Sequence, residues 1–418
     1  KEWVDYYGED GVYISFSGGK DSTCLLNIAR NLYPNIKAVF VDTGLEYPEI
    51  RQFVKGFDNV DWIKPKMNFR EVIKKYGYPF ISKEVAECVY GARKYLTKII
   101  EEENLLDRQT DRQTDRQTDR QTDRQTDQSH TGIFTKNLQE QANTLSMINR
   151  SGGGTIQDIV NSQDLRSTVE KRPKGEGQRL RLARLLGMLT KDGQIKANIP
   201  SGALSNYAQT KWKFLLEAPF EIGQQCCRVM KKSPAHQYSK ETMRKPITAQ
   251  MASESRLRTQ QWLKNGCNAF DAKNPISNPM SFWTEQDVLW YIKLYNIPIA
   301  PVYGNIVNVD GDEVDLSSFK DGELLDDDRP LLKTTGCQRT GCVFCGYGCH
   351  LEKPGEGRFE RLKITHPKLY KYLMSPWEYT ETIINPETLE EIEVVRHGLN
   401  YKEIIDWINE HGGTDIRY

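Results

Sequence analysis

The chain has 418 residues, of which 38% are hydrophobic and 27% are charged. This length exceeds what a single hydrophobic core usually serves, so we expect two or three packed units. The 57 basic and 57 acidic residues cancel, which leaves no global charge to draw the chain to nucleic acid or to a membrane surface. No apolar stretch approaches the roughly 18 residues of a spanning helix, and no secretory signal is evident, so we expect a cytoplasmic protein that does not enter a membrane.

The first 103 residues alternate between the patterns of strands and of helices. Five elements are predicted in chain order: strand 11–16, helix 21–32, strand 36–41, helix 48–57 and strand 60–63. Such alternation implies parallel strands joined by right-handed crossovers. The predicted fold class is therefore α/β, with a Rossmann-like doubly wound parallel sheet and a helical, cysteine-rich C-terminal part. Sheets of this kind bind ligands at the carboxyl ends of their strands.

A polar insertion follows a further predicted helix at 82–103. Asp-Arg-Gln-Thr occurs five times in tandem over residues 107–126 and contains no apolar side chain. A four-residue period drifts around a helix of about 3.6 residues per turn, so the repeat presents no constant face. We interpret it as a solvated insert, with an isolated charged helix as the alternative, and we expect 104–178 to be a lid, linker or partly disordered excursion.

Ordered structure is predicted again from residue 179. The expected elements are an amphipathic basic helix from 179 to 186, helix 207–216, strand 246–252, helix 283–294 with Thr284 as its N-cap, and an exposed acidic hairpin over 305–328. This pattern divides the chain into four parts: a first half of the nucleotide-binding core at 1–103, the insertion at 104–178, a second half of the core at 179–304, and a cysteine-rich and basic region at 305–418.

A glycine-rich loop joins the first predicted strand to the first predicted helix. Its sequence is Ser15-Phe16-Ser17-Gly18-Gly19-Lys20-Asp21-Ser22-Thr23. The two glycines allow close backbone approach to an oxyanion, and the helix N-terminus adds unpaired amides and partial positive charge. The hydroxyls and Lys20 supply further donors, which is chemistry suited to a pyrophosphate. A Walker A loop is excluded, because Asp follows the lysine and the four-residue spacer between glycines is missing.

This loop resembles the pyrophosphate motif of the adenine-nucleotide α-hydrolase superfamily, which includes ATP pyrophosphatases, sulfate adenylyltransferase small subunits and sulfonucleotide reductases. Asp42-Thr43-Gly44 with Glu46, after the second predicted strand, resembles the second signature of that superfamily. The resemblance implies that these acidic residues lie near the nucleotide or its metal. A bare helix cap is the alternative for Asp42.

Nine cysteines are unevenly placed, and four of them fall between residues 337 and 349. An odd count in a chain of this size argues against a disulfide scaffold and favours metal binding or redox work. The adjacent pair Cys226-Cys227 suits a multi-iron cluster, in which each thiolate takes a different iron. The pair Cys342-x-x-Cys345 is a common half-site for iron–sulfur or zinc. We expect Cys24, Cys88 and Cys267 to be ordinary buried or surface residues.

Several segments then resemble the phosphoadenosine-phosphosulfate reductase family, over about residues 1–100 and 200–350. They are Pro219-Phe220 through Cys226-Cys227-Arg228, Ser253-Glu254-Ser255-x-x-Arg258, Asn278-Pro279 with Trp283, Asp287-Val288 and Tyr291-Ile292, and Gly341-Cys342-x-x-Cys345. The resemblance is strongest to iron–sulfur adenylylsulfate reductases. It implies one [4Fe–4S] cluster on Cys226, Cys227, Cys342 and Cys345.

Two other ligand sets remain open. Cys337, Cys342, Cys345 and Cys349 could hold a cluster by themselves, an arrangement similar to that of DNA-phosphorothioation sulfur-transfer enzymes of the same family. The same compact set, with His350 as an alternative ligand, could instead hold a structural zinc.

Two departures from the sulfonucleotide reductases favour ATP. No cysteine follows Cys349, so the mobile C-terminal nucleophile of those enzymes is missing unless Cys349 or Cys337 substitutes for it. The loop also keeps the intact form that suits a β,γ-pyrophosphate. The expected reaction is therefore attack at the α-phosphate with release of pyrophosphate, coupled to sulfur chemistry. Lys20 and Asp21 are the catalytic candidates, and Mg²⁺ is expected near Asp21 or Asp42.

Several partners follow from this interpretation. Glu254, Arg256 and Arg258 are candidates to contact phosphates or the acceptor, with a surface ion-pair set as the alternative. Basic residues interleaved with Phe359, Tyr370 and Tyr372 could contact a nucleic acid acceptor, or form a solvated helix pair: Lys353, Arg358, Arg361, Lys363, His366, Lys368 and Lys371. A cysteine desulfurase or a thioredoxin-like reductant is the expected protein partner. The competing hypotheses are a sulfonucleotide reductase of sulfate assimilation and a non-catalytic nucleotide-binding module.

Overall fold

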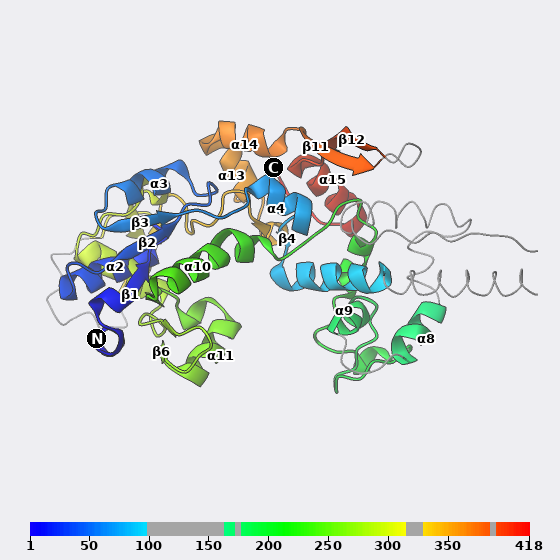
Figure 1. Ribbon diagram of the computed structural model, residues 1–418, viewed down its shortest axis with the longest axis horizontal. Helices are drawn as coiled ribbons and strands as arrows, with labels where there is room; N and C mark the ends of the chain where they lie inside the picture. Colours follow the sequence, from blue (N-terminus) through cyan, green and yellow to red (C-terminus); the bar gives the residue numbers. More distant parts are fainter. Residues whose placement is uncertain (98–162, 172–176, 315–328, 385–389) are drawn as a thin grey trace, which may run out of the picture. The chain divides into compact units, whose positions relative to one another are not determined.

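The computed structural model describes residues 1–97, 163–171, 177–314, 329–384 and 390–418 (Figure 1). The Asp-Arg-Gln-Thr repeat and most of the predicted insertion lie outside these residues. The chain divides into two compact units. The first unit combines 1–72 with 227–345, and the second combines 73–226 with 346–418.

A six-stranded sheet in the order β3-β2-β1-β5-β7-β6 forms the framework of the first unit (Figure 1). The strands are β1 (Val12–Ser15), β2 (Ala38–Val41), β3 (Val60–Ile63), β5 (Lys245–Ile247), β6 (Asn268–Ala269) and β7 (Ile276–Ser277). All neighbours are parallel except β6, which pairs antiparallel with β7 at one edge. The predicted parallel α/β sheet is confirmed.

Both faces of this sheet are covered, as its near-continuous apolar strands require. Tyr13 and Val39 pack with Tyr238 of α10 (Ser233–Thr242) on one face. Side chains alternate along a strand, so Val12 and Ile14 point to the opposite face, and both are fully buried. This double covering fits the predicted doubly wound arrangement.

The remaining elements of the first unit connect and cover the strands. They are α1 (Glu2–Tyr7), η1 (Glu9–Gly11), α2 (Lys20–Leu32), α3 (Pro48–Lys55), η5 (Arg228–Lys232), η6 (Ala252–Glu254), α11 (Arg256–Asn265), α12 (Glu285–Leu294), η7 (Pro301–Tyr303), β8 (Ile306–Asn308) and β9 (Leu332–Thr334). Helix α12 packs against α2, where the Tyr291 hydroxyl donates to Asn27 Oδ1 at 2.9 Å.

Most predicted elements of this unit are present, with two corrections. The strand predicted at 246–252 is only the three-residue β5. The acidic hairpin predicted over 305–328 lies partly outside the described residues, and its first strand, β8, pairs antiparallel with β9 at Leu332–Thr334, beyond the predicted range. A tight turn does occur at Gly311, whose φ is 106°, but the sheet partner comes from beyond it.

The second unit is mostly helical, with small two-stranded sheets. Its helices are the C-terminal part of α4 (Phe69–Tyr76), residues 83–97, α8 (Gln163–Lys171), α9 (Gly177–Leu185), η3 (Ser201–Ala203), η4 (Thr210–Leu216), η10 (Cys349–Leu351), α13 (Arg358–Thr365), α14 (Pro367–Met374) and α15 (Tyr401–Gly412). The helix predicted at 207–216 is the 3₁₀ helix η4, which begins three residues later.

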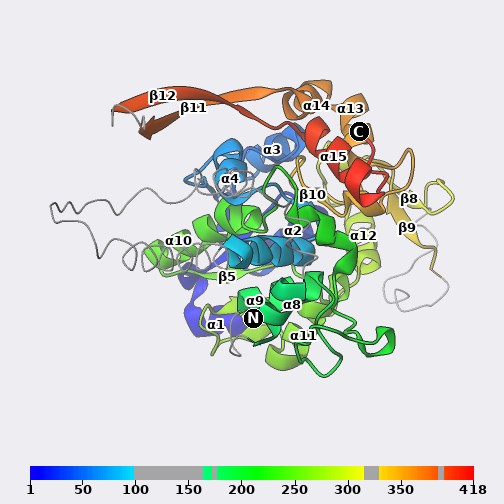
Figure 2. The same ribbon diagram turned by 90° about the vertical axis from the view of Figure 1, so that its right-hand side faces the viewer.

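Parallel strands β4 (Phe80–Ile81) and β10 (Gly346–Tyr347) bring distant segments of the second unit together. Phe80 there packs against Tyr401 and Phe359. The long antiparallel pair β11 (Trp377–Ile384) and β12 (Glu391–Gly398) forms a twisted ribbon that is conspicuous in Figure 2. Among the described residues, no helix is long and apolar enough to cross a membrane.

Candidate nucleotide and cysteine site

The turn between β1 and α2 has a shape that only glycine satisfies at one position. Gly18 has a φ of 71°, in the left-handed region that disfavours side chains. A Cβ on Gly18 would come within 2.8 Å of Val54 Cγ2 and 2.9 Å of Ile50 Cγ2, both on α3. The glycine therefore fixes how closely this loop approaches α3.

Hydroxyls of the predicted loop brace its backbone. Ser22 Oγ and Thr23 Oγ1 each donate to the Gly19 carbonyl oxygen at 2.9 Å. The Ser17 amide donates to Ser22 Oγ at 3.2 Å, and Ser17 Oγ lies 3.1 Å from the same oxygen. These bonds hold the loop against the first turn of α2, so its amides keep a constant direction. Ser22 and Thr23 thus act on the loop itself in this structure.

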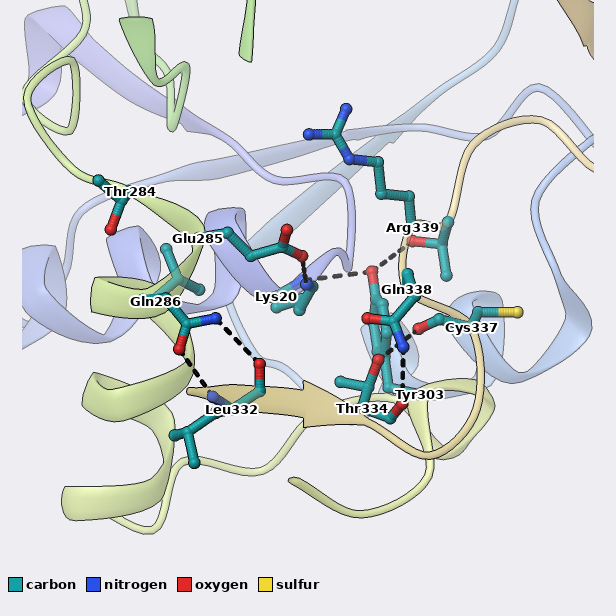
Figure 3. A network of polar contacts seen from close by, with 12 residues as sticks. Lys20, Thr284, Glu285, Gln286, Tyr303, Leu332, Thr334, Cys337, Gln338 and Arg339 are labelled. Atoms are coloured by element: carbon teal, nitrogen blue, oxygen red, sulfur yellow. Dashed lines mark hydrogen bonds and ion pairs between the residues drawn. The ribbon is translucent and has the colours of Figure 1, made fainter. Parts of the chain in front are cut away.

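Lys20 is the first residue of α2, and its side chain is only 4% exposed. Figure 3 shows it between Glu285 and Tyr303. Its ammonium group forms an ion pair with Glu285, the first residue of α12, and its amide donates to the Tyr303 hydroxyl at 3.3 Å. A buried ammonium requires such a partner. A phosphate that binds Lys20 must therefore compete with the Glu285 carboxylate.

The second predicted loop, after β2, holds its two carboxylates in different ways. Glu46 accepts from the Thr43 amide at 3.1 Å and from the Thr43 hydroxyl at 2.7 Å. Asp42 is buried and forms an ion pair with Arg51 at 2.9 Å. Asp42 is thus already neutralised by a neighbour, whereas Glu46 reaches a cavity.

That cavity, of about 480 Å³, lies within the first unit at the carboxyl ends of β1, β2 and β5. Ser15, Ser17 and Glu46 are the predicted site residues that line it. The other polar side chains around it were not singled out from the sequence: Lys231, Lys232, His236, Ser239, Lys245, Thr248, Gln250, Gln261, Asn274 and Thr340. Tyr13, Phe16, Val39, Phe40 and Ile50 supply an apolar wall. A cavity of this size, with an apolar wall and convergent polar groups, is typical of small-molecule sites.

A charged network surrounds Asp21. Burial raises the pKa of Asp21 above its usual value; Lys20 opposes this shift, Glu285 adds to it, and Arg339 and Arg258 oppose it. Arg258 also forms an ion pair with Glu254, and Arg339 lies 3.8 Å from the same carboxylate. Two of the three predicted acceptor residues thus lie at this network. Arg256, at the start of α11, is exposed.

Three of the predicted cluster cysteines influence one another within the first unit. Burial raises the pKa of Cys342 to about 11; Lys231 opposes the rise, and Glu46, Cys345 and Cys227 add to it. The Cys345 amide donates to the Cys342 carbonyl at 3.0 Å, which closes a turn between the two thiols. The fold therefore brings Cys227 close to a cysteine pair more than 110 residues away in sequence.

Lys231 joins this thiol group to the cavity. It lies on the π-helical turn η5, four residues after Cys227, and its ammonium is 3.7 Å from Glu46. Burial lowers the pKa of Lys231, but Cys342 and Glu46 outweigh burial and raise it overall. The lysine therefore stays charged while facing both the cavity and the sulfur atoms.

The other cysteines have different surroundings. Cys337 is buried in the first unit near Tyr303, and its sulfur points away from Lys20 in Figure 3. Cys349 is buried in the second unit, on η10. Cys24 and Cys88 are buried as expected, and Cys267 is partly exposed. Within the described part of the chain, no three His, Cys, Asp or Glu side chains are already arranged to hold a metal ion.

The C-terminal basic residues surround two helices rather than an obvious groove. Phe359 of α13 is fully buried and belongs to the core of the second unit. Lys363 lies over the Tyr370 ring at 5.5 Å, and Arg358 forms an ion pair with Glu352 at 2.6 Å. One of the three predicted stacking aromatics is therefore unavailable to a ligand.

Comparison with known proteins assigns the family. A model of the phosphoadenosine phosphosulfate reductase domain matches residues 11–134 and 190–346, well over half of the chain. The chain belongs to this family. The matched residues contain both strand-end loops, Cys226-Cys227 and the Cys342–Cys345 pair. Membership of this family supports nucleotide-related chemistry for the chain.

Two relatives match over a short stretch. An uncharacterised protein of Methanocaldococcus jannaschii is 39% identical over 70 residues, which are 16% of this chain and 17% of that protein. Sulfate adenylyltransferase subunit 2 of Proteus mirabilis is 37% identical over 70 residues, 14% of this chain and 22% of that protein. The chain thus spans less than a quarter of the length of either relative.

Sequence reasoning missed several residues of this family member's site. Lys231 could have been noticed, because a basic pair follows Cys226-Cys227 by one helical turn. Arg339 and Thr340 lie between Cys337 and Cys342, a segment that was interpreted only through its cysteines. Tyr303 carries no local signal, since it reaches the loop solely through the packing of η7.

Proposed function

We propose that the protein binds ATP with Mg²⁺, cleaves it at the α-phosphate with release of pyrophosphate, and couples this reaction to sulfur transfer or redox chemistry at a [4Fe–4S] cluster. The observation that carries the proposal is the cavity in the first unit. Ser15 and Ser17 of the glycine loop line this cavity. Lys231, which also lines it, interacts electrostatically with Cys342 and Cys227. Nucleotide and sulfur chemistry would thus share one enclosure.

The loop supports ATP as the nucleotide. Attack of an acceptor on the α-phosphorus breaks the bond to the bridging oxygen, and the electron pair leaves with pyrophosphate. The amides at the start of α2 and the Lys20 ammonium can hold that negative charge. Lys20 exchanges Glu285 for the phosphate as it does so. Mg²⁺, when bound, would neutralise phosphate oxygens, and Asp21 is the better candidate to hold it because Asp42 pairs with Arg51.

The thiol group fits an iron–sulfur cluster. Cys227 and Cys345 are close enough to Cys342 to raise its pKa, and Cys226 precedes Cys227 in the sequence. Thiolate ligands must lose their protons, and the charged Lys231 beside them favours that loss. When bound, the cluster would supply electron transfer or a site for sulfur. Cys337 is grouped with Tyr303 instead, which favours the split ligand set over the compact one.

Three measurements on an anaerobic preparation, the last of them sulfite production from adenylylsulfate, separate the candidate activities. Iron and acid-labile sulfide are measured first, and pyrophosphate release from ATP is measured next. We expect the iron and sulfide content of one [4Fe–4S] cluster per chain and release of pyrophosphate from ATP. We expect no sulfite from adenylylsulfate with a thiol reductant. Sulfite production would instead establish the alternative, a sulfonucleotide reductase. Nucleotide binding with neither product would leave a binding module.

Variants connect each activity to its residues. Lys20→Met should lower pyrophosphate release by about 10²- to 10³-fold, as loss of a charge-stabilising group does, and leave iron content unchanged. Cys342→Ser should lower iron content without affecting ATP binding, and Cys267→Ser is the matched control that should change neither. Normal iron in Cys342→Ser would refute this ligand set. Once these activities are established, candidate acceptors, nucleic acid among them, can be assayed with the active enzyme.

A further inference from the structure

Residues 335–345, here called the cysteine segment, are bonded through their backbone to η7 and to the loop after β2. Near its start, the Gly336 amide donates to the Tyr303 carbonyl at 2.8 Å and the Cys337 amide donates to the Val302 carbonyl at 2.9 Å. Near its end, the Val343 amide donates to the Leu45 carbonyl at 2.8 Å, beside Glu46. The segment that carries Cys342 and Cys345 is therefore attached at η7 and at the loop after β2.

Its attachment at η7 leaves no room for side chains. A Cβ on Gly336 would come within 2.4 Å of the Val302 carbonyl oxygen. Gly304 has a φ of 66°, and a Cβ there would come within 2.3 Å of Thr335 Oγ1. The backbone of η7 and that of the cysteine segment are thus in direct contact. A displacement of Tyr303 would therefore move the cysteine segment as well.

Tyr303 also touches the nucleotide loop. Its side chain is 2% exposed, and its hydroxyl accepts from the Lys20 amide at 3.3 Å. The same hydroxyl is hydrogen-bonded to Thr340 Oγ1, and Thr340 lines the cavity together with Gly341. Burial raises the pKa of Tyr303 to about 12, so the phenol keeps its proton. One phenolic oxygen therefore lies between the first amide of α2 and the cysteine segment.

Counting donors shows what a phosphate would change. Without ligand, the Tyr303 oxygen accepts the Lys20 N–H, and one of the two hydroxyl protons lies between Tyr303 and Thr340. A phosphate only accepts hydrogen bonds. When it binds the α2 amides, the Tyr303 proton can turn to the phosphate, and Thr340 must then donate to the Tyr303 oxygen. The bonds become a directed chain from Thr340 through Tyr303 to the phosphate.

We propose that Tyr303 is a positioning residue that transmits occupancy of the glycine loop to the cysteine segment through Thr340. This inference rests on the proposed binding of ATP at that loop. It explains why the buried ring at the start of α2 is a phenol, whose hydroxyl joins the Lys20 amide to Thr340. Its consequence is that nucleotide binding orders the residues just before Cys342, so the sulfur chemistry is set in place only when ATP is present.

The test compares Tyr303→Phe and Thr340→Val with the wild-type holoprotein. Backbone amide exchange of residues 336–343 is measured with and without ATP, and ATP affinity is measured by calorimetry. In wild type, we expect ATP to slow exchange in this segment by about tenfold. In both variants, the slowing should fall below about twofold, while ATP affinity weakens by only about three- to tenfold, the effect of one lost hydrogen bond.

Two further variants separate positioning from general damage. Tyr291→Phe removes a hydrogen-bonded hydroxyl elsewhere in the same unit and should leave the slowing intact. Thr340→Ser keeps the hydroxyl and should restore it. Full slowing in Tyr303→Phe and Thr340→Val with ATP bound would overturn this inference alone. If the wild-type protein binds no ATP, both the inference and the proposed function are wrong.

Discussion

A side chain at Gly18 would cost free energy in two ways, through backbone strain and through a steric clash with α3, and experiment can separate the two. Gly18→Ala would impose a φ of 71° on alanine and a contact of 2.8 Å with Val54, whereas Gly44 has a φ of 74° with nothing within 4 Å of a Cβ. Gly44→Ala is therefore the matched control for backbone strain alone. We expect Gly44→Ala to cost about 1 kcal/mol and Gly18→Ala about 1–3 kcal/mol more, measured by denaturant unfolding. Equal costs would mean that α3 yields freely.

The stability of the folded protein should depend on pH through the carboxyl group of Asp21. Its pKa is raised mainly by burial, with Glu285 adding and Lys20, Arg339 and Arg258 opposing. A raised folded-state pKa means that the native protein binds this proton more tightly than the unfolded chain does, so stability falls as pH rises through that window. Asp21→Asn should therefore be more stable than wild type at pH 7, and the advantage should shrink as pH falls below the usual aspartate range. Thermal midpoints across pH would check this, and a constant advantage would contradict it.

The ion pair between Lys20 and Glu285 predicts an increase in affinity from a loss of charge. Phosphate must displace the Glu285 carboxylate to reach Lys20. Glu285→Gln should therefore tighten ATP binding by about three- to tenfold, although the unliganded protein should be less stable because Lys20 is buried without its partner. In a Lys20→Met background the same substitution should have no such effect. Calorimetric titration of the four proteins completes the cycle, and unchanged affinity in Glu285→Gln would exclude competition.

At the scale of elements, α12 shows how a local signal fixes a helix. Thr284 Oγ1 accepts from the Asp287 amide at 3.3 Å, and Asp287 Oδ2 accepts from the Thr284 amide at 2.7 Å. Thr284→Ala should cost about 1 kcal/mol in the free energy of unfolding, and Thr284→Ser should cost much less. Denaturation midpoints provide the measurement. A neutral Thr284→Ala would show that contacts with α2 alone hold this helix.

The same element explains what sequence reasoning can and cannot predict. Helix α12 and the glycine loop were predicted because their signals lie within a few residues. Strand β8 pairs with β9, which lies beyond the predicted hairpin, and a strand of three residues carries little local signal. Tyr303 and Lys231 reach the site by packing across the fold, so no spacing rule could have named their roles.

At the scale of the whole molecule, the cavity belongs to one unit only. Every residue that lines it lies within 1–72 or 227–345. ATP at about 100 times its dissociation constant should stabilise that unit by about 2.7 kcal/mol. We therefore expect ATP to slow amide exchange in α2 and α12, and to leave the Phe80, Phe359 and Tyr401 core of the second unit unchanged. Equal slowing in both units would show that they unfold as one.

The chain leaves the cavity-bearing unit after residue 72 and returns at residue 227. The described residues between these two points belong to the other unit, so two separate stretches of the chain supply the cavity wall. A gene split between codons 97 and 163 would give two polypeptides, each carrying one side of the wall. If mixing the two polypeptides restores pyrophosphate release, the split protein could report on their association. Its activity would then depend on whether the two polypeptides are brought together.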